Sequence, residues 1–68
     1  MKTTADEVFE LYKEKKHLLN RRESDIVSRY YGFGKNRRHT LQEIGDVYSL
    51  TRERVRQIKC RGLIKLGI

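Results

Sequence analysis

The sequence contains no proline, no tryptophan and a single cysteine, Cys60. One cysteine excludes an intrachain disulfide and a zinc site built from several cysteines. Apolar residues occur only in short runs, and nothing resembles a membrane span or a signal peptide. The lack of proline and the hydrophobic content of 37% suit an all-α domain, and a reduced cytoplasm is a compatible location.

Acidic residues are scarce in the second half of the chain. Residues 35–68 hold nine Lys and Arg against three Asp and Glu, whereas residues 1–34 hold seven against six. A charge that served only solubility would be spread evenly, so we expect the second half to form the docking surface. The net charge of +7 makes nucleic acid the expected partner, ahead of a membrane or an acidic protein. Residues 1–68 are expected to form one domain, too small to enclose a sizeable catalytic cavity.

Capping residues and apolar periodicity predict four helices. The helices are expected from Thr4 to Lys16, from Asn20 to just before Gly32, from Thr40 to Tyr48 and from Thr51 to about Lys65. Each begins at a side chain that can accept a hydrogen bond from a free N–H group of the first turn. Asn20 with Glu23 and Thr40 with Glu43 also fit the capping-box pattern. Residues 32–39 are expected to form a loop rich in glycine and cations.

The last two predicted helices have the spacing of a helix-turn-helix, at about residues 40–66. Only residues 49–51 separate them. Gly45 is small where two such helices cross most closely, and Ser49 stands at a turn position that favours Gly or Asn because φ is often positive there. The positions between the helices are apolar: Ile44, Tyr48, Leu50, Val55 and Ile58. An ordinary helical hairpin with the same spacing is the alternative.

A projection of the last helix at about 100° per residue separates its faces. The inner face is expected to hold Val55, Ile58, Gly62 and Leu66. The outer face is expected to hold Glu53, Gln57, Cys60 and Ile64. Cations flank this outer stripe, with Arg52 and Arg56 on one side and Arg54, Arg61 and Lys65 on the other. Such a layout is typical of a helix that reads the DNA major groove with its centre and contacts phosphates with its flanks.

The residue types on the outer face fit the hydrogen-bond pattern of the bases. Glu53 can accept from the amino group of cytosine, Gln57 can pair with adenine, and Arg52 or Arg56 can bind guanine with two hydrogen bonds. An acid would not help a helix that bound only phosphates, so Glu53 favours sequence-specific reading. Two alternatives remain for Glu53: an interaction with the helix dipole, or a pair with Arg56 or Gln57 in the same helix.

The runs Thr-Leu-Gln-Glu-Ile-Gly at 40–45 and Leu-Thr-Arg-Glu-Arg-Val-Arg-Gln-Ile at 50–58 resemble region four of the sigma-70 family of RNA polymerase sigma factors. The stretch from Leu19 through Arg22 and Glu23 to Gly32 resembles the first conserved segment of that region. The similarity runs from about Leu18 to Leu66. It implies a domain that binds the minus-thirty-five promoter element as duplex DNA in bacterial or phage transcription initiation.

The resemblance also implies roles for single residues. Arg52, Glu53 and Gln57 fall on base-contacting positions, and Arg56 falls on a position used for contacts at the groove edge and with phosphate. The expected phosphate contacts are Arg22, Arg38, His39, Thr40, Leu41, Arg54 and Arg61. A docking surface for the flap of the polymerase β subunit is expected to include Phe9, Tyr12, Leu18, Ile26 and Tyr30. Ordinary core packing is the open alternative for these apolar residues.

Two other kinds of function are alternatives to promoter binding: regulation of the polymerase and catalysis. One alternative is a stand-alone regulator that docks on the flap and redirects the polymerase, with activators or anti-sigma factors as further partners. Catalysis is not expected, because neither His17 nor His39 has the spacing of a nucleophile–base pair or a metal site. No cofactor or metal is expected. Since 68 residues cannot hold the other domains of a sigma factor, the chain is expected to be an excised domain or a natural stand-alone protein.

Overall fold

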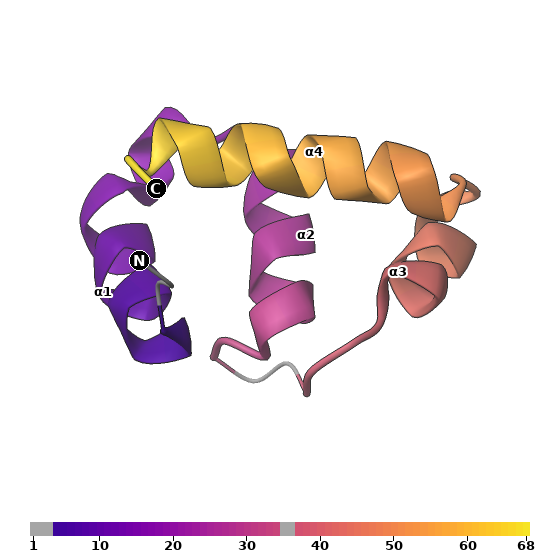
Figure 1. The fold of residues 1–68 in the computed structure, drawn as a ribbon, viewed down its shortest axis with the longest axis horizontal. Helices are drawn as coiled ribbons and strands as arrows, with labels where there is room; N and C mark the ends of the chain where they lie inside the picture. Colours follow the sequence, from indigo (N-terminus) through magenta and orange to yellow (C-terminus); the bar gives the residue numbers. More distant parts are fainter. Residues whose placement is uncertain (1–3, 35–36) are drawn as a thin grey trace.

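The computed structural model describes residues 4–34 and 37–68. Its helices are α1 (Ala5–Lys15), α2 (Arg21–Tyr31), α3 (Leu41–Tyr48) and α4 (Arg52–Lys65). A short 3₁₀ helix, η1 (Lys16–Leu18), follows α1 directly. In Figure 1, α4 runs along one edge and packs on α2 and α3, while α1 lies at the end where the chain finishes. The predicted all-α, four-helix architecture is confirmed, and η1 is the one element that the sequence pattern did not predict.

The capping residues act as predicted. Capping boxes are formed by Thr4 with Glu7, by Asn20 with Glu23 and by Thr40 with Glu43. The hydroxyl of Thr51 accepts from the main-chain N–H of Arg54 at 3.1 Å. Gly32 ends α2 in the left-handed conformation with φ of 74°, as expected from its place in the sequence. Local hydrogen bonding therefore sets where the helices begin and where α2 ends.

The helix-turn-helix consists of α3, α4 and the tight turn between them. Ser49 adopts the left-handed conformation with φ of 57°, and the N–H of Leu50 donates to the carbonyl of Gly45 at 2.8 Å. A Cβ atom on Gly45 would lie only 2.5 Å from the carbonyl oxygen of Leu50. The predicted close approach at Gly45 is thus confirmed, and its partner is the backbone of the turn.

A core between α2, α3 and α4 holds α4 in place. Its buried members are Ile26, Ile44, Val55 and Ile58. A second core cluster joins α1 and α2 through Val8, Val27 and Phe33. Burying each aliphatic side chain stabilises the fold by about 1.5–3 kcal/mol. The predicted inner face of α4 is confirmed, since Leu66 and Gly62 are buried as well.

Gly62 brings α2 and α4 close together. A Cβ atom there would lie 3.0 Å from Cγ2 of Val27. Glycine inside a helix costs about 1 kcal/mol relative to alanine. The tight contact with Val27 accounts for glycine at this position.

Candidate nucleic-acid interface

The outer face of α4 is open to solvent along its first two turns. Arg52, Glu53, Arg54, Arg56 and Gln57 are all exposed, opposite the buried Val55 and Ile58. Cys60 is half-buried, and Ile64 is 69% exposed. The helical projection therefore places this face correctly, and the polar side chains predicted to contact bases lie together on it.

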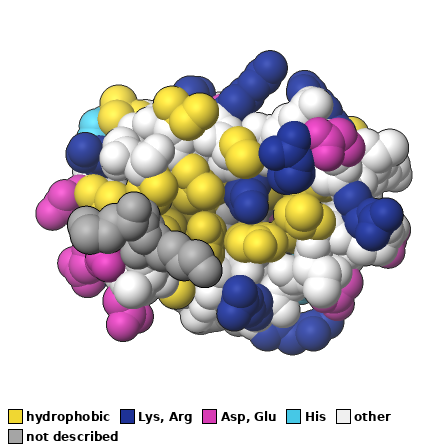
Figure 2. All heavy atoms as spheres, viewed as in Figure 1, with side chains coloured by type: hydrophobic (Ala, Val, Ile, Leu, Met, Phe, Trp, Pro, Cys, Tyr) yellow, Lys and Arg dark blue, Asp and Glu magenta, His cyan; other side chains and the backbone are white. Residues whose placement is uncertain are grey.

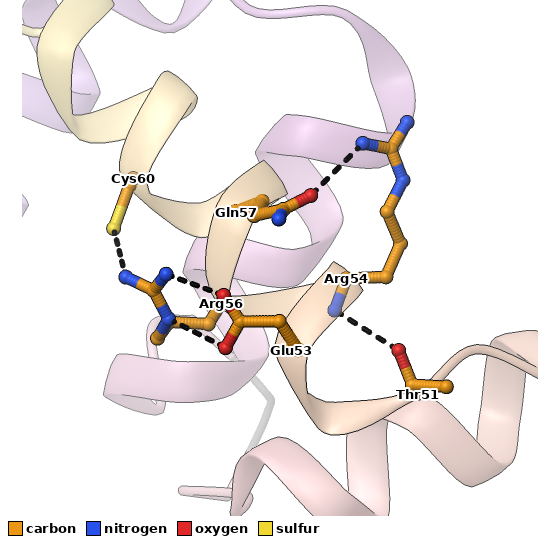
Figure 3. Close-up of polar contacts among 6 residues, drawn as sticks. All are labelled: Thr51, Glu53, Arg54, Arg56, Gln57 and Cys60. Carbon is orange, nitrogen blue, oxygen red and sulfur yellow. Dashed lines mark hydrogen bonds and ion pairs between the residues drawn. The ribbon is translucent and has the colours of Figure 1, made fainter.

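Glu53 and Arg56 form a two-point ion pair on this face (Figure 3). Nε of Arg56 donates to Oε2 of Glu53 at 3.0 Å, and Nη2 donates to Oε1 at 2.5 Å. The hydrogen bonds from Arg56 lower the pKa of the Glu53 carboxyl, and the positive charge of Arg56 lowers it further. The pair also raises the pKa of Arg56. The structure contains the intrahelical pair with Arg56, and Glu53 also lies in the first turn of α4, so the helix-dipole alternative stays open.

Arg54 and Gln57 lie on the other flank of α4 (Figure 3). Nη1 of Arg54 donates to Oε1 of Gln57 at 3.4 Å, which is a long hydrogen bond. This contact is weak and exposed, so a DNA phosphate or base can replace it readily.

The residues predicted to contact phosphate come from α2, α3, α4 and the segment before α3. The guanidinium of Arg22, on α2, lies 5.2 Å from the ring centre of Tyr48. Thr40 and Leu41 lie at the start of α3, where the capping box engages the N–H groups of Thr40 and Glu43, and where the N–H of Leu41 has no main-chain acceptor within the helix. Arg54 and Arg61 are exposed on α4, and Arg38 is exposed before α3. In Figure 2, acidic side chains gather at the end of the molecule formed by α1, and over the other helices cations and acidic side chains are interspersed.

His39 is held in place by the main chain. Its N–H donates to the carbonyl of Arg29 at 2.8 Å, which ties the segment before α3 to the end of α2. Nδ1 of the His39 ring is buried without a hydrogen-bond partner among residues 4–34 and 37–68. The ring is only half-buried, so a phosphate contact through its other nitrogen remains a prediction.

A model of the family described as "Sigma-70, region 4" matches residues 17–66. The chain belongs to this family. The matched residues agree with the resemblance seen between Leu18 and Leu66. Region 4 is a helical DNA-binding domain and not an enzyme family.

Whole sigma factors contain sequences similar to this region 4 domain. The RNA polymerase sigma factor SigA of Nostoc sp. is 46% identical over 48 residues, which cover 71% of this chain and 12% of SigA. SigA of Bacillus sp. is 39% identical over 69 residues, with coverage of 94% of this chain and 18% of that protein. RpoD of Neisseria gonorrhoeae is 40% identical over 57 residues, which cover 84% of this chain and 9% of RpoD. The chain thus spans less than a fifth of the length of these relatives.

The apolar residues predicted for flap docking fall into different environments. Leu18 is 50% exposed on η1. The rings of Phe9 and Tyr12 are half-buried and pack on Phe33, with ring centres 4.9 and 5.3 Å apart. Tyr30 is half-buried beneath the ammonium of Lys59, 4.3 Å from its ring centre.

Ile26 does not belong to a docking surface. Its side chain is fully buried in the core between α2, α3 and α4. A partner protein cannot contact a side chain without exposed area, so its assignment to the flap surface was wrong. Core packing, the stated alternative, holds for this residue.

Two polar links between helices had no signal in the sequence. The hydroxyl of Tyr48 donates to Asp25, which also accepts from Nε of Arg29 at 2.9 Å, and this joins α3 to α2. Lys65 donates to the buried carboxylate of Glu23 at 2.8 Å, which joins the end of α4 to the start of α2. Lys65, predicted to flank the outer stripe of α4, also supports the fold through this bond.

The part of the chain that the structure describes contains no cluster of three His, Cys, Asp or Glu side chains that could hold a metal ion. It also contains no helix long and apolar enough to cross a membrane.

Proposed function

We propose that this region 4 domain binds the minus-thirty-five promoter element as duplex DNA during bacterial or phage transcription initiation. The main support is the outer face of α4, where Arg52, Glu53 and Gln57 are exposed directly opposite the buried Val55 and Ile58. A helix held on one side by a core and polar on the other fits the major groove. The names of the relatives, all RNA polymerase sigma factors, agree with this function.

The contacts divide into base reading and phosphate binding. Arg52 is expected to bind guanine, Glu53 cytosine and Gln57 adenine, while Arg56 lies beside them. The phosphate contacts are assigned to Arg22, Arg38, His39, Thr40, Leu41, Arg54 and Arg61. Those from α2 and α3 would set the register of the domain on the duplex, and those on α4 would flank the bases that are read.

Docking on the flap of the RNA polymerase β subunit is the proposed protein contact. An open groove of about 250 Å³ lies between α1 and the loop after α2, and Phe9, Tyr31 and Phe33 line it. Together with the exposed Leu18, it offers apolar surface away from the DNA-reading face. The same surface supports the second candidate function, a stand-alone regulator that redirects the polymerase, and it would also serve activators or anti-sigma factors. Work on the polymerase would place the protein in the cytoplasm.

Binding of the 68-residue chain to duplexes of random and selected sequence tests the proposed function. We expect a sequence preference above a non-specific affinity of about 10⁻⁴–10⁻⁶ M at physiological salt. In a complete initiation complex, tethering to the polymerase would raise the effective concentration. Glu53→Ala is expected to relax the preference at one base pair and leave non-specific affinity equal or higher. An equal loss of affinity for all duplexes would refute base reading by Glu53.

A further inference from the structure

The two-point pair on α4 restricts what Arg56 can do. The edge of its guanidinium formed by Nε and Nη2 is occupied by the two oxygens of Glu53. Its third nitrogen, Nη1, is turned toward Sγ of Cys60, one helical turn further on, at 3.9 Å. Figure 3 shows the guanidinium lying along the helix between these two residues. Binding of guanine needs two parallel N–H groups, and in this structure the Nε and Nη2 pair is bound to Glu53 while Nη1 is turned toward Cys60.

The same pair offsets the charge of Glu53 and holds its carboxylate before a base binds. A carboxylate that faces DNA meets the negative potential of the phosphates, and the adjacent guanidinium offsets that charge. Each carboxylate oxygen has two lone-pair positions, so an oxygen bound to Arg56 can still accept from an amino group. Because the side chain is held before binding, less freedom is lost when the base arrives.

We infer that Arg56 is a positioning residue for Glu53, holding its carboxylate toward a cytosine amino group while reading no base itself. This inference rests on the proposed function, and it moves Arg56 from the base-reading set to a supporting role. Arg52 is then the arginine of the reading face that binds guanine.

The experiment compares single-base-pair preferences of the 68-residue chain and its variants. A randomised duplex pool first identifies the preferred site, and duplexes with every single-pair change are then measured for each variant. The variants are Glu53→Ala, Arg56→Ala, Arg56→Lys, the Glu53→Ala and Arg56→Ala double variant, and Arg54→Ala as a matched control. All of these side chains are exposed, so the variants should fold, and circular dichroism checks that they do.

We expect Arg56→Ala to reduce the preference for the preferred base pair about tenfold, at the same position that Glu53→Ala affects. The double variant should lose no more than either single variant there. Arg56→Lys should recover only part of the discrimination, since a single ammonium cannot bind both oxygens in parallel. In a ¹³C titration without DNA, the pKa of Glu53 should rise in Arg56→Ala and stay unchanged in Arg54→Ala.

Other results would overturn the inference. If Arg56→Ala loses discrimination at a different base pair, Arg56 reads a base of its own. If Arg56→Ala weakens binding to all duplexes alike and reduces the salt dependence of binding, as expected for Arg54→Ala, then Arg56 binds phosphate. In both cases a sequence preference of the unaltered chain would leave the proposed function intact. An unaltered chain without any preference would refute both.

Discussion

The two halves of α4 differ in what holds their side chains. In residues 52–57 the polar side chains pair with neighbours in the same helix, as Glu53 does with Arg56. In residues 58–66 the contacts run to α2, where Gly62 packs on Val27 and Lys65 binds Glu23. Exposed pairs within one helix contribute little to folding, and their side chains stay accessible to a ligand. The exposed polar side chains of the first half are therefore free to bind, while the buried Val55 and the contacts of the second half hold the helix in place.

The largest expected effect concerns the packing of the second half. Leu66→Ala should destabilise the domain by about 2–5 kcal/mol, because its fully buried side chain leaves a cavity. Ile64→Ala, two residues earlier and 69% exposed, should change stability by less than about 0.5 kcal/mol. Urea unfolding followed by circular dichroism measures both. Similar losses for the two variants would contradict the division between the faces.

The two ion pairs that α4 residues make with a glutamate, Lys65 with Glu23 and Arg56 with Glu53, should also differ in their contribution to stability. Glu23→Gln should cost about 1–3 kcal/mol of unfolding free energy, since it removes a charged acceptor from a buried site bound by Lys65 and by the N–H of Asn20. Glu53→Gln should leave the unfolding midpoint unchanged, because that pair is exposed. The same unfolding assay compares them, and equal effects would show that burial does not distinguish the pairs.

Acid should weaken the link through Glu23. Burial raises the pKa of this carboxyl, but the hydrogen bonds from Lys65 and Asn20 and the charges of Lys65 and Arg61 outweigh it and lower the pKa below its usual 4.5. A lowered folded-state pKa gives stability that is full above 4.5 and is lost as the pH falls through the folded value. The stability difference between the unaltered chain and Glu23→Gln should therefore shrink below pH 4.5. A constant difference down to pH 2 would contradict the shift.

The smallest expected effects leave stability unchanged and alter DNA binding. Arg54→Ala and Arg61→Ala should each weaken binding to all duplexes alike and reduce the salt dependence by about one ion. Lys16→Ala, on η1 and outside the proposed phosphate contacts, is the control and should change neither quantity. Binding isotherms at several salt concentrations give the slopes. An unchanged slope in the Arg54 or Arg61 variant would show that the side chain does not reach a phosphate.

Features set by near neighbours in the sequence could be predicted. The helix starts at Thr4, Asn20, Thr40 and Thr51 depend on hydrogen bonds over three residues, and the faces of α4 follow from helix geometry alone. Contacts between distant residues could not be predicted. Nothing near Asp25 in the sequence indicates Tyr48, and nothing near Glu23 indicates Lys65, because the fold alone brings them together.

The error at Ile26 has a related cause. A helical projection shows which residues of α2 are apolar, but it does not show how many neighbours the helix has. Since α2 packs against α3 and α4 on one side and joins the α1 cluster on another, Ile26 is enclosed. The pair of Glu53 with Arg56 was one of the alternatives that the helix spacing allowed, but the spacing left the direction of the guanidinium open.

The contact of Gly45 with the turn has a consequence for reading register. Because backbone meets backbone there, α3 and α4 form a rigid unit, and the spacing between the start of α3 and the reading face is fixed. Successive base pairs along DNA are about 3.4 Å apart. A larger side chain at position 45 that moved α3 by that distance would change no contact residue in the sequence, yet it would shift the bases that α4 reads by one step relative to the phosphates bound at the start of α3.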